Sequence, residues 1–166
     1  MRRAQDTGDV TIVALGAEAM VLQTLEAWFV EEWFDWYGPE GPGDARLDLE
    51  NCLAPESRLP RCLVALNANG TPVGTVSLRD TSPGSDRYPG AWLTALLVEK
   101  ASRRKGIGAQ LIAAAEQEAR RLTFPEILCT TATARFLLLA RGWQHIETLQ
   151  SVSGPLGIYS KALDAD

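Results

Sequence analysis

A basic, glycine-containing turn at residues 103–109 is the part of this chain best suited to chemistry. It has the spacing Arg-x-x-Gly-x-Gly, and it joins an apolar run at residues 92–98 to a helical pattern. A helix that begins at such a turn directs unpaired backbone N–H groups and the positive end of its dipole at it. Glycines let an anion approach the main chain, and Arg103, Arg104 and Lys105 add positive charge. The turn predicts a site for phosphate oxygens, the alternative being an ordinary strand-to-helix connection.

The spacing of this turn differs from that of two common nucleotide loops. It is neither the Gly-x-x-x-x-Gly-Lys-Ser/Thr of a P-loop nor the Gly-x-Gly-x-x-Gly of a dinucleotide fold. It resembles the pyrophosphate loop of the Gcn5-related N-acetyltransferases (the GNAT family), which holds the diphosphate of acetyl-coenzyme A (acetyl-CoA). Residues 134–143, which end in Ala-Arg-Gly-Trp, resemble a second motif of that family, and residues 159–163 resemble its last strand.

The resemblance implies a single N-acetyltransferase domain over residues 1–166, of the α/β (α+β) class. Its central sheet is expected to be mixed, mostly antiparallel and flanked by helices. Hydrophobic periodicity and turn signals give the same order of elements, β-α-α-β-β-β-α-β-α-β-β. The expected strands are 10–15, 61–66, 72–78, 91–98, 126–130, 143–152 and 157–163, and the expected helices are 17–36, 45–53, 108–122 and 132–140. Residues 1–9 are expected to form a flexible N-terminal arm.

The resemblance also implies where acetyl-CoA, the expected co-substrate, would bind. The strand ending at Val98 should splay from the one ending at Thr130, so that the backbone of Leu96 and Val98 pairs with the pantetheine amides. The side chains of Leu96 and Val98 are ordinary core of a buried strand. Arg141 is expected near the adenosine phosphates, and no metal is expected. The implied cofactor-binding residues are Leu96, Leu97, Val98, Arg103, Arg104, Lys105, Gly106, Ile107, Gly108, Ala109, Thr131, Ala134, Leu138 and Arg141.

The catalytic residues of the family are only partly matched. Many members place a tyrosine, the acid for the leaving thiolate, four residues before the glycine of the second motif, and this position is Leu138. Period-two alternation would place Trp92, Thr94 and Leu96 on one face of the central strand, where only Thr94 is polar. A thiol pKa near 8.5 lets a thiolate leave without an acid, and a water held by Thr94 or Thr130 could take the amine proton.

Other polar residues near strand ends are weaker candidates for catalysis. His145 is one, and Asp80 and Glu147 are no different from surface residues. A nucleophilic pair of Cys129 and His145 is a further alternative, without a supporting motif. The chain is therefore expected to be an acetyl-CoA-dependent N-acetyltransferase acting on a primary amine of a small molecule or peptide. The alternative is a catalytically weak or inactive acyl-CoA-binding domain with a sensing or interaction role.

The first predicted helix has the composition of an acceptor site. Aromatic faces and carboxylates together suit an amine, through cation–π attraction and ion pairing. Phe29, Trp33 and Trp36 lie on the apolar stripe and are expected in the core. The candidate acceptor-binding residues are Trp28, Glu31, Glu32, Asp35 and Tyr37.

Composition narrows the class of protein. The length of 166 residues suits one compact domain. The net charge of -5 argues against sequence-independent nucleic-acid binding, which relies on a basic surface. No apolar run approaches the length of a membrane span, and no secretory signal follows Met1, so a cytoplasmic protein without membrane contact is expected. Cys52, Cys62 and Cys129 give neither a disulfide framework nor a zinc pattern. The sequence leaves monomer and homodimer open.

Overall fold

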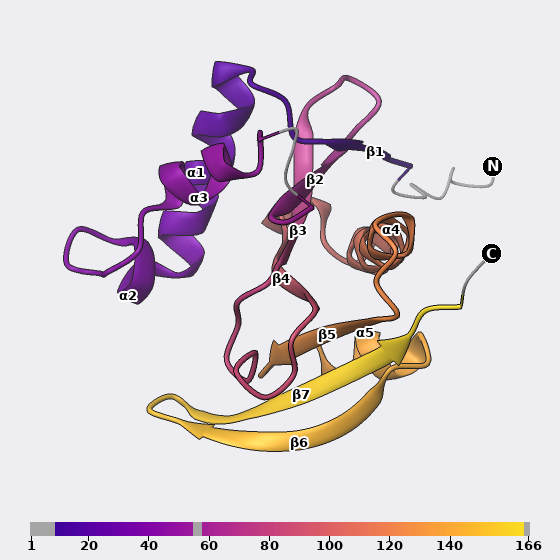
Figure 1. Cartoon of the computed structure of the whole chain (residues 1–166). Coiled ribbons are helices and arrows are strands. Elements are labelled where there is room, and N and C mark those ends of the chain that lie inside the picture. Colours follow the sequence, from indigo (N-terminus) through magenta and orange to yellow (C-terminus); the bar gives the residue numbers. More distant parts are fainter. Residues whose placement is uncertain (1–8, 55–57, 165–166) are drawn as a thin grey trace.

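A seven-stranded sheet forms the centre of the computed structural model, which describes residues 9–54 and 58–164 (Figure 1). The strands run in the order β1-β2-β3-β4-β5-β7-β6, and all neighbours are antiparallel except β4 and β5. Their bounds are β1 Thr11–Ala14, β2 Arg61–Leu66, β3 Pro72–Arg79, β4 Ala91–Val98, β5 Glu126–Thr131, β6 Gln144–Ser151 and β7 Gly154–Ala162. The predicted fold class is confirmed, while the expected arm at 1–9 lies outside the described residues except for Asp9.

Helices cover both faces of the sheet (Figure 1). On one face α4 (Ile107–Arg121) buries its apolar stripe, including Leu111 and Ile112, against β2 to β5. On the other face α1 (Ala19–Glu32) and α3 (Ala45–Asn51) pack together over β2, with Leu25 and Phe29 fully buried. The remaining helices are α2 Phe34–Tyr37, the short 3₁₀ helix η1 Lys100–Ser102 and α5 Arg135–Ala140. Within the described ranges, no helix has the length and apolar character needed to cross a membrane.

The expected helix at 17–36 is in fact two helices. Trp33 has φ -119° and ψ 53°, which is not helical, and it separates α1 from α2. Because the helical phase is reset there, Trp36 does not continue the apolar stripe and is 55% exposed. The expectation that Trp36 belongs to the core is therefore wrong, whereas Phe29 is fully buried and Trp33 is partly buried beside it.

A β-bulge interrupts the central strand β4. Its pairing with β3 shifts register between Thr75 and Ser77, and Ala95 in β4 has φ 52°. The bulge moves later side chains to the opposite face. Trp92 packs away from α4, but Leu96 packs on the α4 side. The expectation that Trp92, Thr94 and Leu96 share one face is wrong for Leu96, because strict alternation ends at Ala95.

Candidate active site

A cleft of about 840 Å³ opens where β4 and β5 separate. The two parallel strands pair only at Ala91 with Ile127 and at Trp92 with Leu128. The expected splay of these strands is thereby confirmed. The cleft is lined by Glu32, Trp33, Ser82, Leu93, Thr94, Ala95, Leu96, Leu97, Val98, Ser102, Arg103, Arg104, Gly106, Ile107, Gly108, Ala109, Cys129, Thr130, Thr131, Ala132, Thr133, Ala134, Leu137 and Leu156.

The basic turn closes one end of this cleft at the start of α4. Gly106 caps the helix with φ 80°, and Arg104 is also left-handed with φ 64°. The first backbone N–H groups of a helix have no partner within it. A Cβ atom at Gly106 would meet no atom of the described chain within 4 Å, so the helix start is open on this side. The Nε of Arg103 donates to the carbonyl of Val98 at 2.9 Å, which holds the guanidinium beside the end of β4.

Most of the residues expected to contact acetyl-CoA line this cleft. They are Leu96, Leu97, Val98, Arg103, Arg104, Gly106, Ile107, Gly108, Ala109, Thr131 and Ala134. The hydroxyl of Thr131 accepts hydrogen bonds from the backbone N–H groups of Thr133 (3.1 Å) and Ala134 (2.9 Å), so it shapes the entry to α5. Lys105, Leu138 and Arg141 do not line the cleft.

Leu138 is fully buried in the core beneath α4. Its neighbour Leu137 lines the cleft instead, and Leu137 Cδ1 would lie 3.5 Å from a Cβ atom at Gly108. Consecutive residues of a helix point about 100° apart, so the two leucines face different surroundings. The side chain at the position of the family's tyrosine thus faces away from the cleft.

Arg141 binds a buried carboxylate instead of facing the cleft. Its guanidinium donates to Glu116 of α4, with Nε–Oε2 at 2.8 Å and Nη2–Oε1 at 3.2 Å. Lys161 Nζ (2.6 Å) and Trp143 Nε1 (3.3 Å) donate to the same carboxylate. Burial alone raises the pKa of Glu116, but hydrogen bonds from Arg141, Lys161 and Trp143 outweigh it, and the pKa is below its ordinary value. Arg141 therefore has a structural partner that the sequence did not indicate.

The three catalytic candidates differ in their surroundings. Thr94 lines the cleft, and its buried hydroxyl has no hydrogen-bond partner among the described residues. Thr130 also lines the cleft, but its hydroxyl donates to the carbonyl of Pro83 at 2.6 Å. His145 lies outside the cleft on β6, where its Nε2 is 2.9 Å from the hydroxyl of Thr148. Glu147 is bonded to Arg87 and Tyr88, and Asp80 is exposed.

A Cys129–His145 nucleophilic pair is not formed. Both residues pair with Tyr159 of β7, which runs between their strands. Two strands that flank a third lie about 9–10 Å apart, too far for a proton transfer. Burial raises the pKa of the Cys129 thiol to about 12, which opposes formation of a thiolate. The described residues hold no group of three or more His, Cys, Asp or Glu that could bind a metal ion.

Of the five candidate acceptor-binding residues, only Glu32 lines the cleft, and it does so with Trp33 at the end of α1. Glu31 and Glu32 are both exposed, but Glu31 Oε1 lies outside the cleft, 3.9 Å from Lys100 Nζ. Asp35 is exposed on α2, and Trp28 packs against the core of the helical layer. Tyr37 stacks on Phe29 and donates to Asp48 Oδ2 at 2.7 Å. Burial, together with that hydrogen bond, raises the pKa of Tyr37 to about 12.

Sequence reasoning missed several residues of this site. Ser82 lies in the polar loop after β3, and Leu137 is the leucine that faces the cleft in place of Leu138. The spacing of the α5 leucines could have indicated Leu137 if the start of that helix had been known. Arg79, at the end of β3, does not line the cleft and is held by Asp48 at 3.2 Å under the helical layer. A single arginine at a strand end gave no signal in the sequence.

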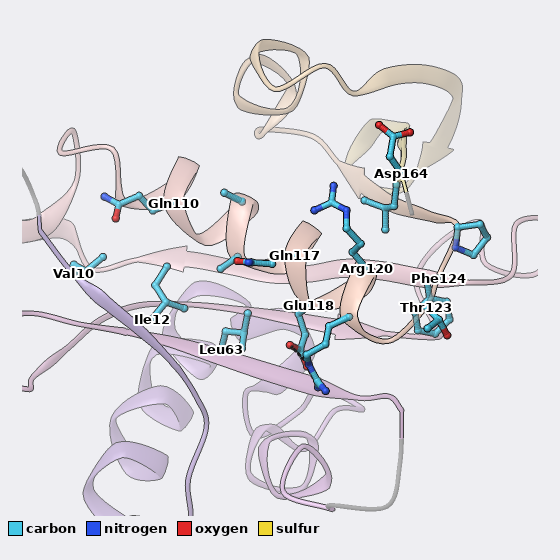
Figure 2. A pocket seen from close by; sticks show the side chains of 15 residues that line it. Val10, Ile12, Leu63, Gln110, Gln117, Glu118, Arg120, Thr123, Phe124 and Asp164 are labelled. Carbon is cyan, nitrogen blue, oxygen red and sulfur yellow. Dashed lines mark hydrogen bonds and ion pairs between the residues drawn. The ribbon is translucent and has the colours of Figure 1, made fainter. Parts of the chain in front are cut away.

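A second hollow, of about 1190 Å³, lies along α4 and is also lined by Ile12 of β1, Leu63 of β2 and residues 123–125 and 163–164 (Figure 2). Val10 and Ile12 lie at one side of it, and Gln110 and Gln117 project into it from α4. Glu118 there is bonded to Arg121, with Nε–Oε2 at 2.9 Å. The hollow is lined by neither the basic turn nor the separated ends of β4 and β5, so its larger volume does not make it the reactive site.

Comparison with known proteins identifies the family of this chain. The sequence model of the Acetyltransferase (GNAT) family matches residues 22–138, well over half of the chain, and the chain belongs to this family. No curated protein matches it in sequence.

Solved structures of acetyltransferases have the same fold. An aminoglycoside 6'-N-acetyltransferase complexed with coenzyme A is 15% identical, with a TM-score of 0.74 over 94% of this chain and 98% of that one. The aminoglycoside 6'-N-acetyltransferase from Enterococcus faecium is 16% identical, with a TM-score of 0.72 over 94% and 98%. A phosphinothricin acetyltransferase from Sinorhizobium meliloti in complex with acetyl-CoA is 16% identical, with a TM-score of 0.73 over 93% and 88%.

Proposed function

We propose that this protein is an acetyl-CoA-dependent N-acetyltransferase that acetylates a primary amine of a small molecule or peptide. The observation that carries the proposal is the cleft between β4 and β5, which ends at the open start of α4. Family membership supports the reaction class, and similar folds bind coenzyme A or acetyl-CoA. The charge of Arg103 and Arg104 and the space at Gly106 fit a diphosphate.

The backbone and the side chains of the cleft would have different tasks. Among the described residues, β4 does not pair with β5 beyond Trp92, so an extended ligand can pair with this part of β4 as a short extra strand. The α4 N-terminus and the two arginines would hold the diphosphate. Acetyl-CoA, when bound, supplies an acetyl group activated as a thioester. Leu137 and Ala134 would give its thiol end an apolar wall.

Thr94 is the side chain best placed to assist the reaction. Thr94 lines the cleft, and its buried hydroxyl has no partner among the described residues, so this hydroxyl would hold an ordered water or donate to a developing oxyanion. The attacking amine must be neutral, and its proton would pass through such a water to solvent. A thiolate with a pKa near 8.5 can leave without a tyrosine. Positioning of the amine would supply much of the remaining rate enhancement.

Thiol release from acetyl-CoA in the presence of polyamines, aminoglycosides, amino acids and short peptides tests this proposal. We expect release above the rate of hydrolysis with at least one class of amine. Gly106→Glu should abolish the release, because it places bulk and negative charge at the diphosphate site. Thr94→Val, which replaces the hydroxyl by a methyl group, should lower kcat by about 100- to 1,000-fold and leave the KM for acetyl-CoA nearly unchanged.

A second function is favoured by Leu138, because a buried leucine cannot protonate a thiolate. In that case the chain is an acyl-CoA-binding domain that is catalytically weak or inactive. It would bind acetyl-CoA but release no thiol with any amine. Activity that appears only in Leu138→Tyr would establish this second function and overturn the first.

A further inference from the structure

The guanidinium of Arg79 has a partner within the described residues for only one of its three nitrogens. Its Nη1 forms an ion pair with Asp48 Oδ2 at 3.2 Å. Its Nε and Nη2 are buried, and neither has a hydrogen-bond partner in the described part of the chain. A buried donor without an acceptor is destabilising, and more so when it is charged. Native proteins rarely leave such groups unpaired unless they serve a ligand or an ordered water.

The two unpaired nitrogens form one edge of the guanidinium plane. Nε–H and one N–H of Nη2 point in parallel, and this edge matches the two oxygens of a carboxylate. Asp48 holds the opposite side of the group, and the same Asp48 oxygen accepts from the hydroxyl of Tyr37 at 2.7 Å. Asp48 therefore orients the guanidinium, while its second edge, Nε and Nη2, is buried without a hydrogen-bond partner among the described residues.

Arg79 lies beside the apex of the cleft. It is the register partner of Trp92, and Trp92 with Leu128 is the last pair that joins β4 to β5. Ser77, two residues before Arg79, pairs with Thr94, which lines the cleft. Directly opposed residues and alternate residues of a strand share a face of the sheet. Arg79 and Thr94 therefore lie on the same face, which is the face opposite α4.

The acceptor side of the cleft is on this face. Glu32 and Trp33 come to the cleft from α1, and Ser82 comes to it from the loop that follows Arg79. The Arg79 side chain is 18% exposed as a whole, but its Nε and Nη2 are buried, so the atoms that cover this edge must move aside before a ligand can reach it. A carboxylate bound at Arg79 and an amine near Glu32 and Thr94 would belong to one molecule that spans this face.

We propose that Arg79 binds a carboxylate of the acceptor, so that the acetylated substrate is an amino acid or a related molecule with both an amine and a carboxylate. The inference rests on the proposed N-acetyltransferase function and specifies its substrate class. Arg79 is an acceptor-binding residue, Asp48 is its positioning residue, and neither takes part in acetyl transfer itself.

Matched acceptors test the inference on the wild-type protein. Thiol release is measured with the standard L-amino acids and β-alanine, each beside its carboxamide, which keeps the amine and removes the charge. We expect a kcat/KM on the order of 10- to 100-fold higher for the carboxylate member of at least one pair, as for charge-assisted hydrogen bonds. Equal rates within every pair, or a preference for the carboxamides, would overturn the inference.

Substitution of Arg79 separates binding from a structural role. Arg79→Lys keeps the charge but loses the two parallel donors, so the carboxylate-to-carboxamide ratio should fall about tenfold or more while the carboxamide rate stays nearly unchanged. Arg46→Gln is the matched control, because Arg46 pairs with Glu26 and Glu50 in the same helical layer but away from the cleft. A ratio unchanged in Arg79→Lys, or lowered equally in Arg46→Gln, would contradict a role in acceptor binding.

Failure of the proposed acetyltransferase function can be distinguished from failure of the carboxylate site. If no amine in either series releases thiol, the enzymatic function fails. The same pairs are therefore also titrated calorimetrically into wild-type protein saturated with coenzyme A. Heat with carboxylates that is absent with carboxamides, and lost in Arg79→Lys, supports the carboxylate site in either case. No heat with any carboxylate at millimolar concentration overturns it.

Discussion

Glu116 on α4 and Arg141 after α5 form an ion pair in which two nitrogens of the guanidinium face two oxygens of the carboxylate, at 2.8 and 3.2 Å. Lys161 of β7 donates to the same carboxylate at 2.6 Å. The Glu116 carboxylate thus links α4 to the chain segment that precedes β6 and to β7, which follows it. This relationship gives Arg141 a structural partner, whereas its place in the second family motif suggested a role in binding phosphates.

We predict that Arg141→Met destabilises the fold without changing the affinity for acetyl-CoA. Loss of charge-assisted hydrogen bonds to a buried carboxylate should lower the free energy of unfolding by about 1.5–3 kcal/mol. Urea unfolding and calorimetric titration of acetyl-CoA measure the two effects. Arg103→Met, at the cleft, is the matched variant and should show the opposite pattern. A weaker affinity for acetyl-CoA in Arg141→Met, at an unchanged free energy of unfolding, would show instead that Arg141 binds the phosphates.

The stability of the protein should depend on pH through Glu116. Its pKa in the folded state is below the ordinary value of 4.5, so its contribution is complete above about 4.5 and is lost as pH falls through the lower folded value. Glu116→Gln removes this contribution. We expect the difference in unfolding free energy between wild type and Glu116→Gln to be largest at neutral pH and to shrink below pH 4.5. A difference that is constant from pH 7 to the acid limit would contradict the assignment.

Leu138→Tyr should destabilise the protein rather than improve catalysis. Leu138 is fully buried in a core that a larger, polar side chain would overfill, with an expected loss of about 1–3 kcal/mol. Leu137→Tyr, on the neighbouring position that lines the cleft, should be tolerated better. Thermal unfolding of both variants measures this. A Leu138→Tyr protein as stable as wild type would show that this part of α5 can repack.

Among the acidic residues of α1 and α2, only Glu32 should affect acceptor binding. Glu32 lines the cleft, while Glu31 and Asp35 are exposed outside it. Glu32→Ala should raise the KM for the amine with kcat nearly intact, which is the behaviour of an interaction shared by ground and transition states. Glu31→Ala and Asp35→Ala serve as controls with unchanged KM. Three unchanged KM values would move the amine site away from α1.

The sequence predicted the sheet and its covering helices well because their signals are local. Leu111, Ile112, Ala115 and Ala119 recur at helical spacing and are all fully buried on α4. The turn at Gly106 and the last residues of β4 were placed correctly for the same reason. Each is defined by its immediate neighbours in the chain, and these neighbours also decide the local structure.

The missed features depend on tertiary contacts. The bulge at Ala95 changed which side chains of β4 face α4, and no residue type in that apolar run indicated it. Glu116 and Arg141 are 25 positions apart, so their pairing follows from the packing of α5 on α4. The free edge of Arg79 became visible only when Asp48 of α3 was placed against β3.

Calorimetric titration of acetyl-CoA into wild-type protein and Gly106→Glu tests the central claim most directly. The account predicts saturable binding of acetyl-CoA to wild type, weaker binding of pantetheine, which lacks the diphosphate, and no binding of acetyl-CoA to a folded Gly106→Glu variant. The Cβ position at Gly106 is free of clashes with the described residues, but its φ of 80° is one that an L residue adopts only with strain. Gly106→Ala, which carries the same strain without the bulk or the charge, is therefore the matched control and should still bind acetyl-CoA. Absence of heat with wild type at millimolar acetyl-CoA, or equal affinity in Gly106→Glu, would contradict the account.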